Sequence, residues 1–229
     1  MIRMIRGKRK NDELRDFEIK AGVVPNANGS AMVRMGKTTA IAAVYGPRNL
    51  YPRFMQVTDR AIIRCNYNMV PFSTKERVRP GPSRRSKEIS LVTKNSLESV
   101  LCLEEFPKAV VDVFIDIIQA DAGTRCAGIN AAAVALADAG IPMKDLVASV
   151  AAGKIGNKYM LDLEGEEEDE SACDLPIAYL PRTKGITLLQ MDGDLTPKDV
   201  KEITKLAIKG CEKIYEAQKK ALEKRWVGK

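Results

Sequence analysis

The chain has 229 residues, 45% of them hydrophobic, so it is long enough to bury one large core or two small ones. It contains no histidine, which excludes Ser-His-Asp and Cys-His catalysis, histidine general bases and histidine-ligated metals. The net charge of +7 is uneven: residues 1–100 hold 20 basic and 8 acidic side chains, whereas the rest of the chain holds 17 and 22. A strongly basic half indicates a polyanionic partner.

The five cysteines are scattered and form no Cys-x-x-Cys pair, which argues against a disulfide framework and a structural zinc site. No run of about 18 apolar residues is present, and the basic start lacks the apolar core of a signal peptide. We therefore expect a cytoplasmic protein without a membrane span. Aromatic residues make up only 5%, so a nucleic-acid partner would be held by its backbone rather than by base stacking.

The first half of the chain is predicted to be rich in strands. Residues 1–15 are expected to form a polar arm. Alternating apolar residues predict strands at 17–23, 31–35, 38–45 and 61–70, the last of which carries Arg64. Residues 46–53, which include Arg48 and Arg53, are expected to form a long polar loop.

The segment Gly36-Lys37-Thr38 suggests a nucleotide-binding P-loop, but two observations exclude it. The first glycine of that motif would stand at position 31, which is alanine. A strand is predicted after Thr38, where a P-loop requires a helix. The segment is predicted to be the turn of a hairpin instead.

A helix is predicted from Ser83, as its cap, to about Glu105. Arg84 and Arg85 stand in its first turn, where the helix dipole disfavours positive charge. A purely structural helix would carry acids there. The arginine pair therefore indicates that this helix end binds an anion.

A strand over 111–119, a turn at Gly123 and a helix that begins at Arg125 with Thr124 as its cap form the centre of the predicted fold. The helix is almost entirely small or aliphatic up to Ala139, so it is expected to be buried. The backbone N–H groups, the Thr124 hydroxyl and the Arg125 guanidinium would together cradle a phosphate. The alternative is an ordinary capped helix whose arginine is solvated.

The second half predicts an α+β fold. Strands are expected at 146–152, 158–163, 173–180 and 185–191, with an acidic loop at 164–170 and a long amphipathic helix capped by Thr196-Pro197. No long linker interrupts the chain. We therefore expect one compact domain over 1–229, with helices packed on mixed sheets.

Seven segments in this order resemble the RNase PH family, and within it the catalytic subunit of the archaeal exosome. The segments are 12–15 (DELR), 29–31 (GSA), 42–48 (AAVYGPR), 71–73 (PFS), 80–86 (PGPSRRS), 119–125 (QADAGTR) and 135–142 (ALADAGIP). The resemblance covers nearly the whole chain. It implies an RNase PH-like domain of ribosomal protein domain-2-like β-α-β architecture.

The resemblance also implies an activity: phosphate-dependent 3′→5′ degradation of single-stranded RNA. Inorganic phosphate, the co-substrate, attacks the terminal phosphodiester, and a nucleoside diphosphate leaves. The matching positions imply that Gly123, Thr124 and Arg125 hold this phosphate, while Arg84 and Arg85 grip the last nucleotides. Phosphoryl transfer depends mostly on positioning and charge neutralisation, so these residue types suit it.

Asp174 matches the family's catalytic acid and is expected to protonate the leaving oxygen or to bind Mg²⁺. The family's second aspartate stands six residues earlier, where this chain has Glu168, followed by Asp169. Either Asp169 is brought into place as the second acid and metal ligand, or Glu168 substitutes for it. A solvated acidic run without function is the alternative.

The resemblance further implies a hexameric ring in which this chain alternates with a related inactive subunit, beneath RNA-binding cap proteins. RNA, rather than DNA, would thread the central pore. Arg48 and Arg53 match the region at the pore mouth, and Arg64 is expected to bind RNA with them.

Three rival functions stay open on the sequence. A non-catalytic RNA-binding ring subunit would lack the acid that Asp174 supplies. A stand-alone, tRNA-trimming RNase PH would form a homo-hexamer. A ribosome-associated RNA-binding protein would explain the basic charge but not the phosphate cradle.

Overall fold

The computed structural model describes residue 6 and residues 9–228 of the chain. Its strands are β1 Phe17–Ala21, β2 Gly29–Met35, β3 Thr38–Asn49, β4 Ile62–Met69, β5 Ala109–Gln119, β6 Ala148–Ile155, β7 Lys158–Leu161, β8 Cys173–Leu180, β9 Gly185–Leu189 and β10 Asp192–Gly193. Its helices are α2 Arg84–Glu98, α3 Thr124–Asp138, α4 Gly165–Glu170 and α5 Pro197–Trp226, with short 3₁₀ turns η1 Arg53–Met55 and η2 Leu103–Glu105. The predicted α+β class with mixed sheets is confirmed.

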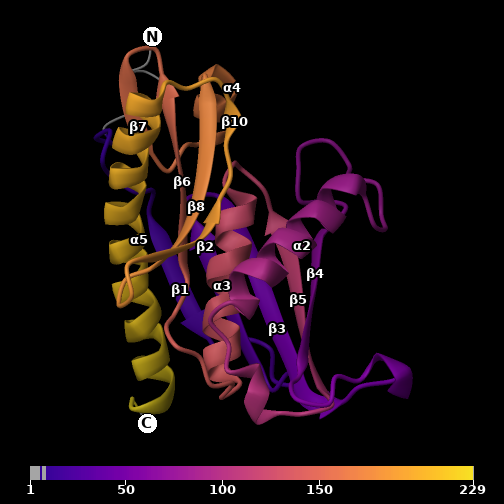
Figure 1. Cartoon of the computed structure of the whole chain (residues 1–229). Coiled ribbons are helices and arrows are strands. Elements are labelled where there is room, and N and C mark those ends of the chain that lie inside the picture. The colour runs from indigo at the N-terminus through magenta and orange to yellow at the C-terminus, as the bar shows by residue number, and fades with distance from the viewer. Residues whose placement is uncertain (1–5, 7–8, 229) are drawn as a thin grey trace.

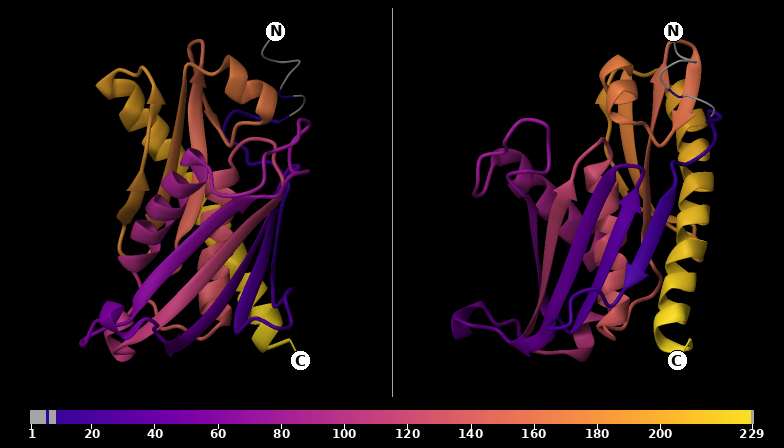
Figure 2. Two further views of the ribbon diagram at one scale, coloured as in Figure 1. Left: turned by 90° about the vertical axis from the view of Figure 1, so that its right-hand side faces the viewer. Right: turned by 180° about the vertical axis from the view of Figure 1, so that it is seen from behind.

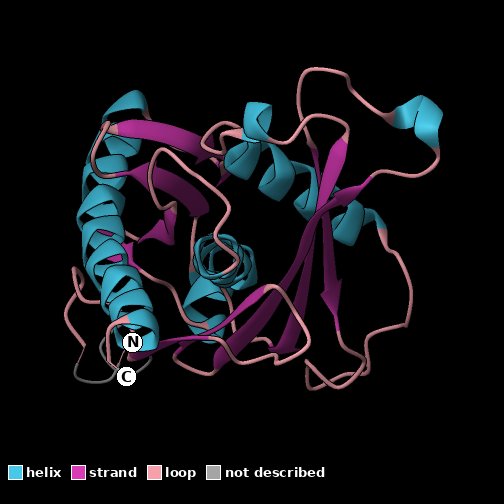
Figure 3. Cartoon of the chain, turned by 90° about the horizontal axis from the view of Figure 1, so that it is seen from below, coloured by secondary structure: helices cyan, strands magenta, loops and turns pink. Residues whose placement is uncertain are grey.

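Two sheets enclose one central helix (Figure 1). The first sheet has the order β1-β2-β3-β5-β4, antiparallel except for the parallel pair β4–β5. The second has the order β10-β8-β6-β7, with β9 also paired to β8. Helix α3 packs on β2 and β3 of the first sheet and on β6 of the second, so it lies between them, as Figure 3 shows end-on.

The outer helices close the remaining faces. Helix α5 runs along β6, β7 and β8 and also packs against β1 at the edge of the first sheet (Figure 2). Helix α2 packs on β4 and β9 and thus touches both sheets. No described helix is both long and apolar enough to cross a membrane.

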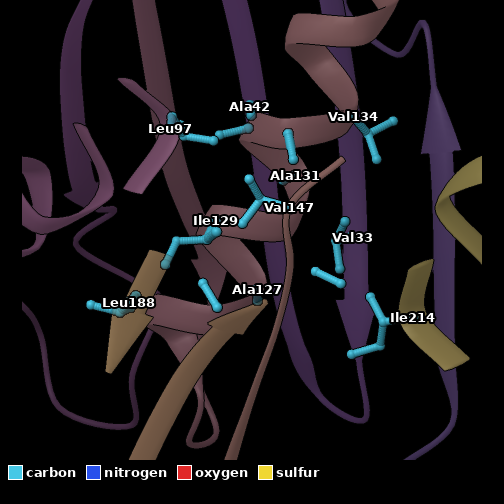
Figure 4. Packing of buried hydrophobic residues seen from close by; sticks show 14 of the residues in the cluster. Val33, Ala42, Leu97, Ala127, Ile129, Ala131, Val134, Val147, Leu188 and Ile214 are labelled. Carbon is cyan, nitrogen blue, oxygen red and sulfur yellow. The ribbon is translucent and has the colours of Figure 1, made fainter. Parts of the chain in front are cut away.

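The core is continuous across these layers (Figure 4). Val33 and Ala42 from the first sheet, Ala131 from α3 and Ile214 from α5 belong to one cluster of buried hydrophobic residues. Almost every residue of α3 is buried, because its alanines let both sheets approach closely. At Gly29 a Cβ atom would lie 2.2 Å from the backbone nitrogen of Ala139, so only glycine fits where β2 meets the end of α3.

Most predicted elements are confirmed, but four local predictions are wrong. Helix α2 ends at Glu98 rather than near Glu105, because Leu101 pairs with Met143 in an isolated bridge. Helix α3 begins one residue early: Gly123 is the N-cap and Thr124 the first helical residue. Arg48 belongs to β3, since the strand continues to pair with β5 through a register shift.

The fourth wrong prediction concerns the acidic segment, which is the helix α4 rather than a loop. Glu164 and Glu167 form a reciprocal capping box, and acidic side chains in a first turn suit the helix dipole. Arg6 then neutralises the buried Glu167 with two hydrogen bonds of 3.0 Å from its Nη1. The favourable local charge and this distant arginine together explain why the segment is helical.

The polar arm is only partly covered by the structure, since residues 1–5, 7 and 8 lie outside the described residues. Its described part is packed rather than solvated. Arg6 and Arg15 are both buried, although neither lies in a helix or strand. This burial brings the start of the chain into contact with the end of β7 and with α4.

Candidate active site

The turn between β5 and α3, residues 120–123, has an unusual backbone. Ala122 and Gly123 both have left-handed conformations, with φ angles of 60° and 64°. Such a conformation costs free energy for alanine, so neighbouring groups must hold it. Thr38 does so from β3: its hydroxyl donates to the carbonyl of Ala122 at 2.7 Å and accepts from the N–H of Asp121 at 2.9 Å.

This backbone presents the start of α3 as an anion site. The N–H groups in the first turn of a helix have no intrahelical acceptors, and they carry the positive end of the helix dipole. Thr124 is buried, and its hydroxyl has no hydrogen-bond partner among the described residues. A buried unsatisfied hydroxyl is costly, so this group is available for a ligand oxygen or for the hydroxyl of Tyr67, which is also buried, unsatisfied and close to it.

Arg125 is held by two side chains from other elements. Its Nη2 donates to Glu88 of α2 at 3.2 Å, and its Nη1 donates to the side chain of Gln190, which follows β9. Gln190 in turn donates to Glu88 at 2.9 Å. The buried Nε of Arg125 has no partner within the described part of the chain, so the guanidinium keeps a donor for an anion.

Arg84 and Arg85 occupy the exposed first turn of α2, as predicted. Ser83 caps this helix through a reciprocal pair of hydrogen bonds with Ser86. The charge of Arg85 lowers the pKa of both Glu168 and Asp174, so this helix start acts electrostatically on the two carboxyl groups. A cationic helix start thus faces the acidic side of the site.

Asp174, on β8, is a carboxyl group whose pKa is clearly shifted by its surroundings in the site. Burial and the negative charge of Glu168 raise its pKa to about 6, against the opposing charge of Arg125. A carboxyl group with this pKa is partly protonated near neutral pH and can donate a proton. Perturbed groups of this kind are typical of catalytic sites.

Glu168 and Asp169 differ in their surroundings. Burial raises the pKa of Glu168, and the charge of Glu168 acts on Asp174. Asp169 is exposed on the same helix. The structure of α4 therefore favours Glu168 as the second acid. Which of the two takes part in catalysis stays a prediction.

The carboxylates suit a metal ion only in combination with a substrate. Among the described residues there is no group of three or more Asp, Glu, His or Cys side chains that could hold a metal. Asp174 and Glu168 supply two carboxylates, neither of which pairs with a cationic side chain in the described part of the chain, and burial raises the pKa of both. Mg²⁺ commonly binds one or two carboxylates together with substrate phosphates. The pair therefore fits a Mg²⁺ that binds with the phosphates.

The other predicted RNA-binding arginines lie at the opposite end of β5. Arg48 of β3 and Arg64 of β4 both donate to the carboxylate of Asp112, Arg64 at 2.6 and 3.0 Å. Asp112 stands seven residues before the end of β5, which is about 23 Å at 3.3 Å per residue. Arg53 is exposed in η1, on a segment that projects at the lower right of Figure 1.

The structure therefore divides the predicted site residues into two groups. Arg125, Arg85 and Glu168 all act through their charges on Asp174, and Gly123 and Thr124 directly precede Arg125; these residues come from the start of α3, from α2, from α4 and from β8. Arg48 and Arg64, which share Asp112 on β5, and the exposed Arg53 of η1 are here called the basic region. Five residues that contact the site or the turn before α3 were not predicted from the sequence: Thr38, Glu88 and Gln190, described above, and Arg15 and Asp162, which are hydrogen-bonded to each other while Arg15 also donates to the carbonyl of Asp121. Only Arg15 carried a signal, because it belongs to the DELR segment.

This fold and this site are those of an RNA-degrading enzyme family. Residues 13–142 match the family model described as 3′ exoribonuclease family, domain 1, and residues 145–210 match its domain 2. The chain belongs to this 3′ exoribonuclease family, also called RNase PH. The prediction of a single domain stays a prediction: the family divides the chain in two, while residues of both parts share one buried cluster.

Curated relatives place the chain more closely. It is 55% identical to the exosome complex component Rrp41 of Pyrococcus abyssi over 219 residues, which cover 96% of this chain and 88% of that one. It is 52% identical to Rrp41 of Methanopyrus kandleri over 220 residues, covering 96% and 92% of the two chains. The resemblance to the archaeal exosome subunit is thereby confirmed.

Solved structures agree with the fold. Rice Rrp46 superposes with a TM-score of 0.83 at 22% identity, covering 93% of this chain and 97% of that one. A chain of the Archaeoglobus fulgidus exosome, solved with RNA bound to the active site, superposes with a TM-score of 0.79 at 27% identity, covering 91% and 90%.

Proposed function

We propose that this chain is the catalytic subunit of an exosome ring and shortens single-stranded RNA from its 3′ end by phosphorolysis. One observation carries the proposal: an anion cradle at Thr124 and Arg125 lies beside Asp174, a carboxyl group whose pKa of about 6 suits a proton donor. The membership in the 3′ exoribonuclease family and the Rrp41 relatives support it.

In the proposed reaction, the first turn of α3 and Arg125 hold inorganic phosphate. A phosphate oxygen attacks the phosphorus of the last phosphodiester, and the bond from that phosphorus to the 3′ oxygen of the preceding nucleotide breaks. The products are a nucleoside diphosphate and an RNA that is one nucleotide shorter. Both reactants are anions, so cationic groups must offset their repulsion, a role that we assign to Arg84, Arg85 and Arg125.

Asp174 would give its proton to the departing 3′ oxygen. Burial and the charge of Glu168 keep that proton bound up to a pH of about 6, which an ordinary aspartate could not do. In the alternative, Asp174 in its ionised form would hold Mg²⁺ together with Glu168 or Asp169, and would then not be the proton donor. When bound, this ion would neutralise negative charge on the phosphate oxygens.

The basic region of Arg48, Arg64 and Arg53 would guide the RNA before it reaches the site. These side chains recognise phosphates rather than bases, so binding would be independent of sequence. We further propose that the chain alternates with a related inactive subunit in a hexameric ring, that cap proteins bind RNA above it, and that the assembly is cytoplasmic. Single-stranded RNA, not DNA, would be the substrate.

The test is the degradation of a 5′-labelled single-stranded RNA by the chain mixed with a candidate partner subunit, in Mg²⁺, with and without phosphate. We expect shortening that requires phosphate and releases nucleoside diphosphates, and that is lost in Asp174→Asn but kept in the exposed control Glu166→Gln. Binding without shortening would indicate a non-catalytic ring subunit. Shortening that ignores phosphate would indicate hydrolysis and refute the mechanism.

Size-exclusion chromatography tests the assembly. Full activity and a hexamer from this chain alone would indicate a stand-alone RNase PH. A hexamer and full activity only after the partner is added would support the exosome ring.

A further inference from the structure

Arg15 is a buried arginine that the reaction described above does not use. It is 3% exposed and precedes β1 in a segment without regular structure. Its Nη2 donates to Asp162 Oδ1 at 2.7 Å, and its backbone N–H donates to Asp162 Oδ2 at 2.9 Å. Asp162 is itself buried, so this pair is shielded from water and fixes the orientation of the guanidinium.

The remaining Nη1 of Arg15 reaches the turn beneath the phosphate cradle. It donates to the backbone carbonyl of Asp121 at 2.7 Å. At Gly123 a Cβ atom would lie 3.0 Å from Arg15 Nη2, so the guanidinium packs directly against the residue that caps α3. Arg15 therefore touches the turn at both its first half and its end.

Arg15 also lies close to the carboxylate helix. Its charge lowers the pKa of Glu168, while burial raises it. At Gly165, the first residue of α4, a Cβ atom would lie 2.7 Å from Asp121 Oδ1, so α4 begins against the same turn. The side chain of Arg15 thus lies where the phosphate-binding turn and the acid-bearing helix meet.

The turn needs such support because of its backbone. Ala122 has a left-handed φ of 60°, which an alanine adopts only when its surroundings impose it. Arg15 holds the carbonyl of Asp121, and Thr38 holds that of Ala122. These two hydrogen bonds fix the peptide groups that precede the first turn of α3, whose N–H groups would face the ligand. Loss of either support would allow the turn to relax to a commoner conformation.

We propose that Arg15, fixed by Asp162, is a positioning residue that holds the turn 120–123 in its phosphate-binding shape against α4. It does not contact the reacting atoms. The inference rests on the proposed function in that the ligand of the turn is the attacking phosphate. The inference adds a specific expectation: if Arg15 shapes the phosphate-binding turn, its replacement changes the binding of phosphate far more than the binding of RNA.

The test compares Arg15→Lys with the control Arg225→Lys, each in the full chain assembled with its partner. Lysine keeps the charge but cannot donate to Asp162 and Asp121 with the geometry of a guanidinium. Arg225 is a control for the loss of an arginine–carboxylate pair away from the turn, because it lies 3.5 Å from the buried carboxylate of Asp138, although Arg225 itself is exposed. Asp138 ends α3, about 21 Å from Thr124 at 1.5 Å per residue.

We expect Arg15→Lys to raise the KM for phosphate about tenfold, as small displacements of binding groups do. The Kd for RNA should stay unchanged, and so should both constants in Arg225→Lys. A second readout needs no RNA: phosphate should raise the melting temperature of the wild type by mass action, and raise it less in Arg15→Lys. Equal changes in phosphate and RNA constants would indicate a general structural role and overturn the proposal.

Thr38→Val covers the case in which Arg15→Lys does not fold. This nearly isosteric change removes the hydroxyl that supports the same turn, and it should raise the KM for phosphate without changing RNA binding. An unchanged KM in the folded variants refutes the inference. A wild type that degrades RNA without phosphate refutes the proposed function, while the melting-temperature series still tests Arg15. A wild type that phosphate does not stabilise refutes the inference.

Discussion

The Nη2 of Arg125 lies 3.2 Å from Oε2 of Glu88, so the arginine assigned to the attacking phosphate already faces a carboxylate. Glu88 also accepts from Gln190, which itself accepts from Arg125. This triangle ties α2, α3 and the end of β9 together at the site. It orients the guanidinium, but its negative charge opposes the binding of an anion.

Glu88→Gln should therefore strengthen phosphate binding. Glutamine can still accept a hydrogen bond from Arg125, but it removes the repulsion between Glu88 and the ligand. For a partly exposed pair we expect about 1 kcal/mol, which is about a fivefold lower Kd for phosphate. Titration calorimetry with inorganic phosphate measures this, with Glu98→Gln at the far end of α2 as the control. A weaker affinity in Glu88→Gln would show that orientation by the charge matters more than repulsion.

The pH dependence of phosphorolysis should report Asp174. If its protonated form is the proton donor, kcat/KM falls as the pH rises through about 6, because the raised pKa marks the loss of that proton. Glu168→Gln removes a charge that raises this pKa, so the descending limb should move to lower pH. A rate that instead increases through pH 6 would show that the ionised carboxylate is the active form.

The same carboxyl group should reduce the stability of the folded chain. Its folded pKa of about 6 exceeds the ordinary value of 3.8, so the folded state binds more protons and its stability falls as the pH rises between these values. Asp174→Asn should then increase the free energy of unfolding at pH 7 by up to about 3 kcal/mol. Urea titrations of both proteins at pH 4 and pH 7 measure this difference in the free energy of unfolding, which should be small at pH 4. An equal difference at both pH values would show that the raised pKa of Asp174 is not its cause.

Arg64 should contribute to RNA binding through phosphate contacts. Burial favours the neutral form of Asp112, but hydrogen bonds from Arg64 and Arg48 outweigh it and hold the pKa of Asp112 below its ordinary value. One carboxylate therefore orients two arginines. Arg64→Gln should weaken RNA binding and reduce the slope of log K against log[salt] by about 0.7. Arg34→Gln, at an exposed position on β2, is the control. An equal effect of this substitution would mean that only the net charge of the protein, and not the position of Arg64, affects RNA binding.

The helix α4 should depend on the start of the chain. Glu167 is buried and accepts from Arg6 and from Arg9, whose Nη2 lies 2.9 Å away. Glu167→Ala would leave two arginines without this partner and should lower the free energy of unfolding by about 3 kcal/mol. The neighbouring Glu166 is exposed, so Glu166→Ala should change it by less than about 0.5 kcal/mol. Urea denaturation of the two variants measures these changes. Similar losses of stability in both would refute the role of the contacts between Glu167 and the two arginines.

Local signals in the sequence were sufficient for most helices and strands. Thr196-Pro197 predicted the start of α5, and the alternation around Gly36-Lys37 predicted the hairpin of β2 and β3. Both signals are local, because helix caps and hairpin turns depend on residues that are close in sequence. The same signals failed for the acidic segment. Its helix depends on a capping box between two glutamates and on Arg6, 161 residues away from Glu167.

The sequence by itself determined the class of fold, the buried alanine-rich helix and the residue types of the anion cradle, because hydrophobic periodicity and helix-start chemistry are local properties. Only the tertiary structure decided how the cradle is shaped and which acid faces Asp174. Thr38, Arg15 and Glu88 reach the site from other elements, and the raised pKa of Asp174 arises from burial and from Glu168. These effects depend on distances across the fold, which sequence spacing does not encode.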